Sequence, residues 1–256
     1  MRVVLRAPVL SLSGYGIHSR QVYEWLESIP GIDLTVEIVK WGMTSWIIDQ
    51  EAENGLIKRI MANSKKVEGV YDMSFQVQLP DEWNPKLAKF NVGITALVET
   101  DRCSQKWVDN CNLMDAIIVP STFTKNVLKR SGDVKVPVSV IPEWYNEEID
   151  NNPEPTDLGE LSTKHNFLSV ATITANNAME DRKNIFNTIK WFCEAFEGNK
   201  DVGLVLKTNH GRSTHIDRRL TNKVINDTIA YVRKGQYPKI HVVHGMMTQK
   251  EVAGLY

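Results

Sequence analysis

The chain has 256 residues, more than a usual single domain, so two domains are expected. Thirty Lys and Arg residues nearly balance 31 Asp and Glu residues, and the net charge of −1 argues against a protein that coats nucleic acid. Hydrophobic residues make up 42% of the chain, enough for packed cores, yet no run approaches the roughly 18 apolar residues of a membrane-spanning helix.

Three cysteines, Cys103, Cys111 and Cys193, form no Cys-x-x-Cys pair. An odd number without a metal-site spacing indicates reduced thiols. The first residues are too few for the apolar core of a signal peptide. We therefore expect a cytoplasmic protein, and a peripheral contact with a membrane stays open.

The chain begins with a strand, a glycine turn and a helix. Val3 to Leu5 is an apolar run, Ser13-Gly14-Tyr15-Gly16 is a tight turn, and apolar residues then recur at helical spacing. This order places backbone N–H groups and a helix N-terminus where a diphosphate can approach, because glycine has no Cβ. Gly14 and Gly16 are thus candidate phosphate contacts, and the alternative is an ordinary glycine-containing turn.

Strands and helices then alternate along the first half of the chain. Apolar runs predict strands and apolar spacing predicts helices, and the alternation implies parallel βαβ units. The expected strands cover residues 34–39, 71–79, 90–95, 115–119 and 136–141, and helices are expected near 56–61 and 121–132.

A polar stretch with Pro153 and Pro155 interrupts this pattern and is predicted to be a linker. Beyond it a second strand–helix series begins, which ends with capping-box spacing at Thr248. The expected division is an N-terminal domain over 1–146, a linker over 147–165 and a C-terminal domain over 166–256.

Cations gather at two strand ends of the second domain. Arg182 and Lys183 lie just before an amphipathic helix, where the helix dipole disfavours positive charge. A bound phosphate would make that arrangement favourable. Lys207 ends the next strand, at the edge where open α/β sheets bind ligands. The alternative is that these are solvated surface charges.

Two carboxylates and one histidine are candidate catalytic groups in the first domain. Glu99 and Asp101 follow a strand, and in an extended segment they would face the same way. They would act on acceptor hydroxyls or as a base, unless they belong to a merely polar loop. His18 at the start of the first helix would hydrogen-bond a substrate, or it caps the turn.

Together these pieces resemble group 1 (family 4-like) retaining glycosyltransferases of the GT-B fold. Each motif is weak alone, but the ordered set spans nearly the whole chain. The matching stretches are Gly14 to Arg20, Val98 to Arg102 with Trp107, Ile118 to Ser121 with Gly132, Val138 to Pro142, Phe167 to Val170, Arg182 to Asn184, Leu204 to Lys207, and His244-Gly245 with Thr248 to Tyr256.

The resemblance implies an α/β protein with two Rossmann-like domains whose parallel sheets face each other across a cleft. The N-terminal domain would hold the acceptor, and the C-terminal domain would hold a nucleotide-sugar donor. Lys183 and Lys207 would contact the donor diphosphate, with Arg182 close by and Gly14 and Gly16 approaching from the other side. The sugar would be transferred with retention, without a metal ion or another cofactor.

Two departures from the family pattern matter. Ala171-Thr172 stands where many members have Gly-Arg, so one phosphate contact is in doubt. The family's Glu-x7-Glu segment should follow the helix that begins at Thr248, but the chain ends at Tyr256. The resemblance therefore predicts an incomplete second domain with an open apolar sheet edge, and a chain that is inactive as it stands.

Two other functions remain open at this point. One is a non-catalytic nucleotide- or sugar-binding protein, and the other is an enzyme of similar fold, such as a nucleotide-sugar epimerase. The sequence does not identify the acceptor, whether glycan, lipid or protein. Nor does it identify the donor's sugar and base or the oligomeric state.

Overall fold

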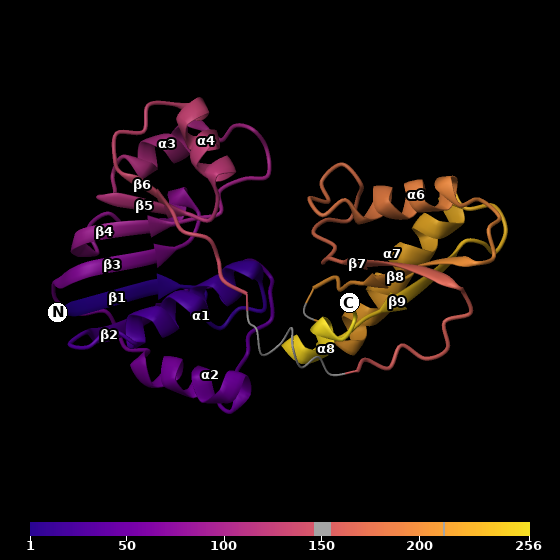
Figure 1. Ribbon diagram of the computed structural model, residues 1–256, viewed down its shortest axis with the longest axis horizontal. Helices are drawn as coiled ribbons and strands as arrows, with labels where there is room; N and C mark the ends of the chain where they lie inside the picture. The colour runs from indigo at the N-terminus through magenta and orange to yellow at the C-terminus, as the bar shows by residue number, and fades with distance from the viewer. Residues whose placement is uncertain (146–154, 212) are drawn as a thin grey trace. The chain divides into compact units, whose positions relative to one another are not determined.

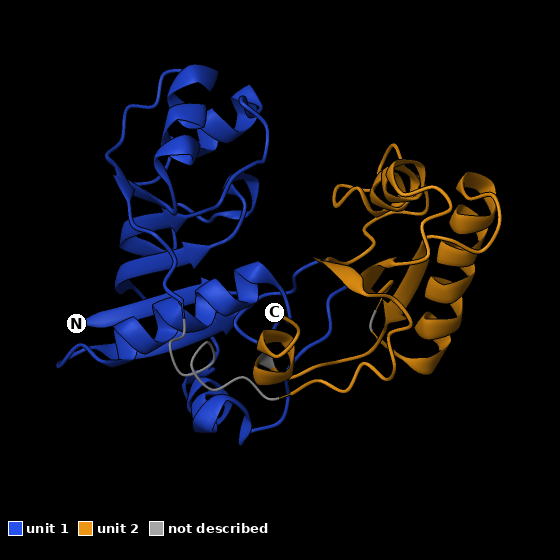
Figure 2. Cartoon of the chain, turned by 45° about the vertical axis from the view of Figure 1, so that its right-hand side comes forward, with its two compact units in different colours: residues 1–145 blue, residues 146–256 orange. Residues whose placement is uncertain are grey.

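The computed structural model describes residues 1–145, 155–211 and 213–256. The chain divides into two compact units, Met1–Tyr145 (unit 1) and Asn146–Tyr256 (unit 2), coloured separately in Figure 2. Residues 147–154 of the predicted linker lie outside the described residues, and residue 165 already belongs to a strand.

Unit 1 is built on a parallel sheet of six strands in the order β2-β1-β3-β4-β5-β6. All its strand pairs are parallel, as the alternating pattern predicts. Its elements are β1 (Arg2–Ala7), α1 (Gly14–Glu27), β2 (Asp33–Ile38), α2 (Ala52–Asn63), β3 (Tyr71–Val77), the short 3-10 helix η1 (Pro80–Glu82), β4 (Ala88–Ile94), α3 (Gln105–Cys111), β5 (Ala116–Val119), α4 (Thr122–Ser131) and β6 (Val138–Val140).

Helices cover the sheet of unit 1 and bury its central strands. In β1, Val3, Val4, Leu5 and Ala7 are all fully buried, which is typical of a strand covered on both faces. Helix α1 packs on β1 and β3, α2 packs beside β2, and α4 packs on β5 and β6 (Figure 1). The carboxyl ends of these strands lead into the turns that carry the candidate residues.

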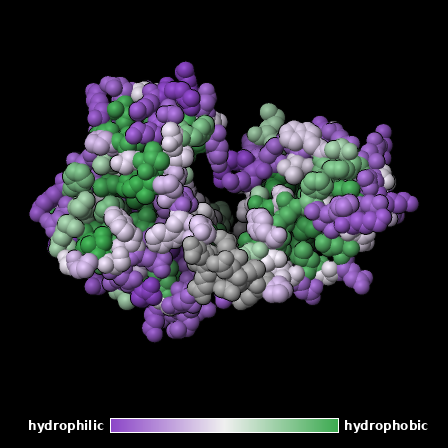
Figure 3. Space-filling model, viewed as in Figure 1, coloured by the Kyte–Doolittle hydropathy of each residue, from purple (hydrophilic) through white to green (hydrophobic). Residues whose placement is uncertain are grey.

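Unit 2 has a parallel sheet of three strands in the order β7-β8-β9. Every residue of the central strand β8 is buried, whereas Phe167 and Val170 on the edge strand β7 are 51% and 40% exposed. Hydrophobic residues reach the surface of both units in Figure 3. The elements are β7 (His165–Val170), α6 (Ile185–Ala195), β8 (Val202–Lys207), α7 (His215–Val232), β9 (Lys239–Val243) and α8 (Gln249–Ala253).

The core of unit 2 lies between its sheet and the helices α6 and α7, which pack against each other. Ile185 and Ile189 of α6 meet Ile225 of α7 and Leu206 of β8 in one buried cluster. At the end of the chain, the predicted capping box is present, with Thr248 and Glu251 bonded to each other's backbone N–H groups.

Candidate functional site

The glycine turn forms the first turn of α1. Ser13 caps the helix, and its hydroxyl oxygen accepts a hydrogen bond from the Gly16 backbone N–H at 3.1 Å. A Cβ on Gly16 would lie 1.9 Å from the Ser11 carbonyl oxygen, so only glycine fits there. Nothing lies within 4 Å of the place that a Cβ on Gly14 would take. Packing therefore explains Gly16, whereas Gly14 leaves open space at the helix N-terminus.

Arg20 is a buried cation beneath this turn, with 2% of its surface exposed. Its Nη1 donates to the carbonyl oxygens of Val9 and Ser11, both at 3.0 Å, and its Nε donates to Glu53 Oε2 at 2.8 Å. Buried charges are costly unless they are paired and hydrogen-bonded, and Arg20 meets both conditions. It fixes the path of residues 9–11, and Glu53 balances its charge.

Tyr15 joins the glycine turn to the end of β4. Its hydroxyl lies 3.0 Å from Thr95 Oγ1 and accepts a hydrogen bond from the Ala96 backbone N–H at 3.0 Å. Its ring stacks on Trp41, with the ring centroids 4.0 Å apart. Burial raises the pKa of the Tyr15 hydroxyl above its ordinary value, so the group stays protonated at neutral pH. Three separate segments are held together by this one side chain.

The His18 side chain lies beside a carboxylate, that of Glu143, and not beside the candidate carboxylates Glu99 and Asp101. Its ring is buried, and Nδ1 lies 3.4 Å from Glu143 Oε1 in the segment after β6. Burial lowers the pKa of His18, and the charge of Glu143 opposes part of that shift. Gln21 Nε2 also donates to the Trp144 carbonyl oxygen at 2.7 Å. Two contacts thus hold the segment after β6 against α1.

Glu99 and Asp101 do not lie on an extended segment. The chain bends at residues 99–101, and both side chains are exposed. The expectation of an extended segment is therefore wrong, and the argument that both carboxylates face the same way loses its basis, because period-two alternation requires extended backbone. The bend follows Leu97, whose φ of 62° is uncommon for a residue other than glycine.

In unit 2 the N-terminus of α6 is already bound by a carboxylate of the same chain, that of Asp181. Asp181 is buried, and its Oδ2 accepts a hydrogen bond from the Ile185 backbone N–H at 2.7 Å. Its Oδ1 accepts bonds from the backbone N–H and the hydroxyl of Thr174, at 2.9 and 2.7 Å. One N–H group at the helix start where a phosphate was expected, that of Ile185, is therefore occupied by a carboxylate, while Arg182 and Lys183 beside it are exposed.

Lys207 is buried at the carboxyl end of β8, with 6% of its surface exposed. Its Nζ donates to the Gly245 carbonyl oxygen at 2.6 Å. Among the residues that the structure describes, no carboxylate forms an ion pair with it. Burial lowers the pKa of the Lys207 ammonium below its ordinary value. A buried cation that is held only by a neutral oxygen is a site where an arriving anion would be stabilised.

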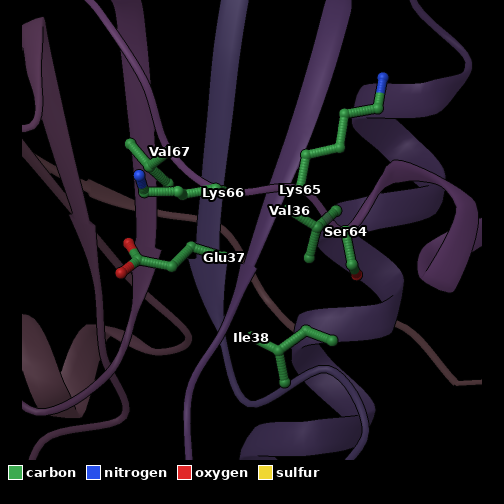
Figure 4. A pocket seen from close by; sticks show the side chains of 7 residues that line it. All are labelled: Val36, Glu37, Ile38, Ser64, Lys65, Lys66 and Val67. Atoms are coloured by element: carbon green, nitrogen blue, oxygen red, sulfur yellow. The ribbon is translucent and has the colours of Figure 1, made fainter.

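A shallow, open depression of ≈ 450 Å³ lies elsewhere in unit 1, between β2 and the segment after α2 (Figure 4). Figure 4 shows the side chains that line it, among them the charged residues Glu37, Lys65 and Lys66. None of the predicted site residues lines it. The depression is therefore separate from the candidate groups described above.

Sequence reasoning missed three of the polar residues that shape these sites. Tyr15 stands inside the Gly14 to Arg20 stretch, and Asp181 directly precedes the Arg182 to Asn184 stretch. Glu143 could not be assigned, because 125 positions separate it from His18. Such a long-range contact is created only by the fold.

Within the described residues, no group of three or more His, Cys, Asp or Glu side chains is placed to hold a metal ion. No helix in the same part of the chain is both long and apolar enough to span a membrane.

No protein-family model and no curated protein sequence matches the chain. Solved structures do match its fold. A trehalose-6-phosphate structure from E. coli, bound with UDP-2-fluoro glucose, aligns over 100% of this chain and 76% of its own, with a TM-score of 0.54 and 9% identity. HepE from Anabaena, in complex with UDP and glucose, aligns over 100% and 71%, with a TM-score of 0.52 and 10% identity.

A third match is a UDP-forming α,α-trehalose-phosphate synthase from Burkholderia xenovorans. It aligns over 99% of this chain and 75% of its own, with a TM-score of 0.51 and 10% identity. Since these alignments cover both units, the predicted GT-B fold is confirmed. At identities of 9–10%, the likeness shows the fold and does not show the activity.

Proposed function

We propose that the protein is a glycosyltransferase that moves a sugar from a nucleotide-sugar donor to an acceptor hydroxyl with retention of configuration. The fold that it shares with proteins solved with UDP and sugars supports this class of reaction. The observation that carries the proposal is Lys207, a buried cation without a carboxylate partner among the described residues, at the carboxyl end of a parallel strand.

The proposed roles divide between the predicted domains. Residues 166–256 bind the donor, with Lys207, Lys183 and Arg182 compensating the charge of its diphosphate. Residues 1–146 bind the acceptor, and Gly14 offers N–H groups of the first turn of α1 to a phosphate oxygen. Gly16 serves the same turn by letting it pack on Ser11.

The leaving diphosphate gains negative charge as the glycosidic bond breaks, and fixed cations stabilise that charge in the transition state. We therefore propose that the reaction proceeds without a bound metal. His18 is proposed to hydrogen-bond the acceptor hydroxyl as a neutral imidazole, in keeping with its lowered pKa. Glu99 and Asp101 are proposed to bind further acceptor hydroxyls from the exposed bend.

Titration of UDP into the full chain by calorimetry tests the donor site. Replacing Lys207 by methionine keeps most of the side-chain volume and removes the charge. The loss of a hydrogen bond from a charged group costs about 1.5–3 kcal/mol, so we expect UDP to bind roughly 10–100 times more weakly. Lys183→Ala should weaken binding in the same direction, by less, because that side chain is exposed.

Lys223→Met is the matched control, since Lys223 is an exposed lysine of the same unit, paired with Asp227 at 2.8 Å. Its UDP affinity should equal that of the wild type. If Lys207→Met binds UDP as tightly as the wild type does, the proposed donor site is wrong. UDP binding without sugar transfer from any donor would favour the non-catalytic binding protein instead.

A further inference from the structure

Three segments at the carboxyl edge of unit 1 contain no charged residue. They are residues 7–17, which include the glycine turn, residues 41–48 after β2, and residues 94–98 at the end of β4. About a quarter of the whole chain is charged, whereas these three segments bring no charge of their own to the candidate ligand site.

Hydrogen bonds hold two of these segments side by side. The Leu12 backbone N–H donates to the Ser45 carbonyl oxygen at 2.9 Å, and the Ile47 N–H donates to the Leu10 carbonyl oxygen at 2.8 Å. Ser11 and Trp46 form an antiparallel bridge between them. The third segment is joined through Tyr15, which stacks on Trp41 and bonds Thr95. These contacts hold residues 41–48 close to the first turn of α1.

The outer side of this ribbon is apolar. Leu10 is buried and Ile47 packs against the core, whereas their neighbours Trp46 and Ile48 are 39% and 71% exposed. This alternation over residues 46–48 is that of a short extended segment with one face inward and one outward. We use the term apolar rim for the exposed apolar residues of the two segments, namely Leu12, Ile17, Met43, Trp46 and Ile48, of which Met43 is 69% exposed.

The charges around His18 do not suit an acceptor that carries its own phosphate. Arg20 lies beneath the turn, but it is buried and its charge is balanced by Glu53. Glu143, which contacts His18, would repel an anionic group placed at His18. A neutral ligand meets no such penalty, and a ligand with an apolar part gains by covering Met43 and Trp46.

We propose that unit 1 binds a neutral acceptor that carries an apolar group, with the apolar group against the apolar rim and a sugar hydroxyl at His18. The inference rests on the proposed function, because it names the class of acceptor that a transferase of this kind would use. Met43 and Trp46 are then specificity-determining residues, since they select acceptors by their apolar part.

Calorimetric titration of the full chain with three soluble probes tests this acceptor class. The probes are glucose, glucose 6-phosphate and n-octyl β-D-glucoside, the last kept below its micelle concentration. Burying an octyl chain against the apolar rim should make the octyl glucoside bind about ten times or more tighter than glucose. Glucose 6-phosphate should bind no tighter than glucose.

Single substitutions test whether the octyl chain binds at the apolar rim. Trp46→Ala and Met43→Ser should each weaken octyl glucoside binding several-fold, by about the affinity that the lost apolar area supplies. Trp191→Ala and Met179→Ser are matched controls in unit 2, where these two side chains are 56% and 97% exposed, and they should leave the affinity unchanged. Equal losses in both pairs would show non-specific detergent binding and would overturn the inference.

Other results separate this inference from the proposed function. If UDP binds but glucose 6-phosphate binds better than octyl glucoside, the acceptor class is wrong and the donor site stands. If octyl glucoside binds at the apolar rim but UDP does not bind, the ligand class stands and the transferase role fails. Sedimentation with phosphatidylcholine vesicles that is lost in Trp46→Ala, without any preference for octyl glucoside, would show a membrane contact instead and would overturn the inference.

Discussion

Gly14 and Gly16 look equivalent in the sequence, yet they have different physical reasons to be glycine. The backbone of Gly16 approaches Ser11 so closely that a Cβ has no space, while a Cβ at Gly14 would point into open space. Neither residue has a φ in the left-handed region, so backbone freedom does not explain either of them. The distance from the added Cβ to its nearest atom therefore distinguishes the two residues: Gly16 is required by packing, whereas Gly14 leaves space for a ligand.

Alanine substitution should separate the two glycines. We expect Gly16→Ala to lower the free energy of unfolding by at least about 2 kcal/mol, because the new Cβ would overlap the Ser11 carbonyl oxygen and force α1 to move. Gly14→Ala should be neutral or stabilising by up to about 1 kcal/mol, since alanine restricts the unfolded chain. Urea denaturation of both variants measures the difference, and equal stabilities would contradict this account of the turn.

At the scale of elements, the N-terminus of α6 is organised by one buried side chain. Asp181 accepts three hydrogen bonds, one from α6 and two from Thr174 in the segment after β7. It therefore ties the end of a strand to the beginning of a helix. Arg182 follows it, with its backbone N–H bonded to Thr174 Oγ1 at 2.9 Å. The two exposed cations thus stand on a segment whose backbone is already fixed.

Asp181→Ala should destabilise unit 2 by about 2–4 kcal/mol, because it removes a helix cap and leaves buried N–H groups unsatisfied. The matched control is Asp201→Ala, which removes a 55% exposed carboxylate that pairs with Lys164 at 3.0 Å. An exposed pair of this kind contributes less than about 1 kcal/mol. Thermal and urea unfolding of the two variants provide the comparison, and similar losses would show that the Asp181 cap does not stabilise α6.

At the scale of the whole molecule, each buried cluster draws its residues from one unit. Ile117 belongs to a cluster around β5 and α4 in unit 1, and Ile225 belongs to the cluster around α6 and α7 in unit 2. A domain with its own core unfolds cooperatively by itself. The structure therefore predicts that the units respond separately to changes in their cores.

Hydrogen exchange followed by mass spectrometry checks that expectation. Ile117→Ala and Ile225→Ala each remove a fully buried branched side chain, at a cost of about 2–5 kcal/mol. Ile117→Ala should reduce protection in peptides from residues 1–145, and Ile225→Ala should reduce it in peptides from 155–256. A loss of protection throughout the chain in both variants would mean that the two units unfold as one.

The fold class and the caps could be predicted from the sequence. Alternating apolar runs and helical spacings predict parallel βαβ units, and both described sheets are parallel. The capping box at Thr248 and the N-cap at Ser121 are local, so their spacing alone reveals them. The helix α3 was missed, because its seven residues are too few to show a helical period.

What the sequence by itself determined is therefore local: where elements form, where they are capped and which residues reach the carboxyl ends of strands. The tertiary structure alone decided the environment of each candidate group, because burial and charge pairing depend on residues far away in the chain. Lys207 became a buried cation against Gly245, and His18 was joined to Glu143. Glu99 and Asp101 lie on a bend after Leu97 rather than on the expected extended segment.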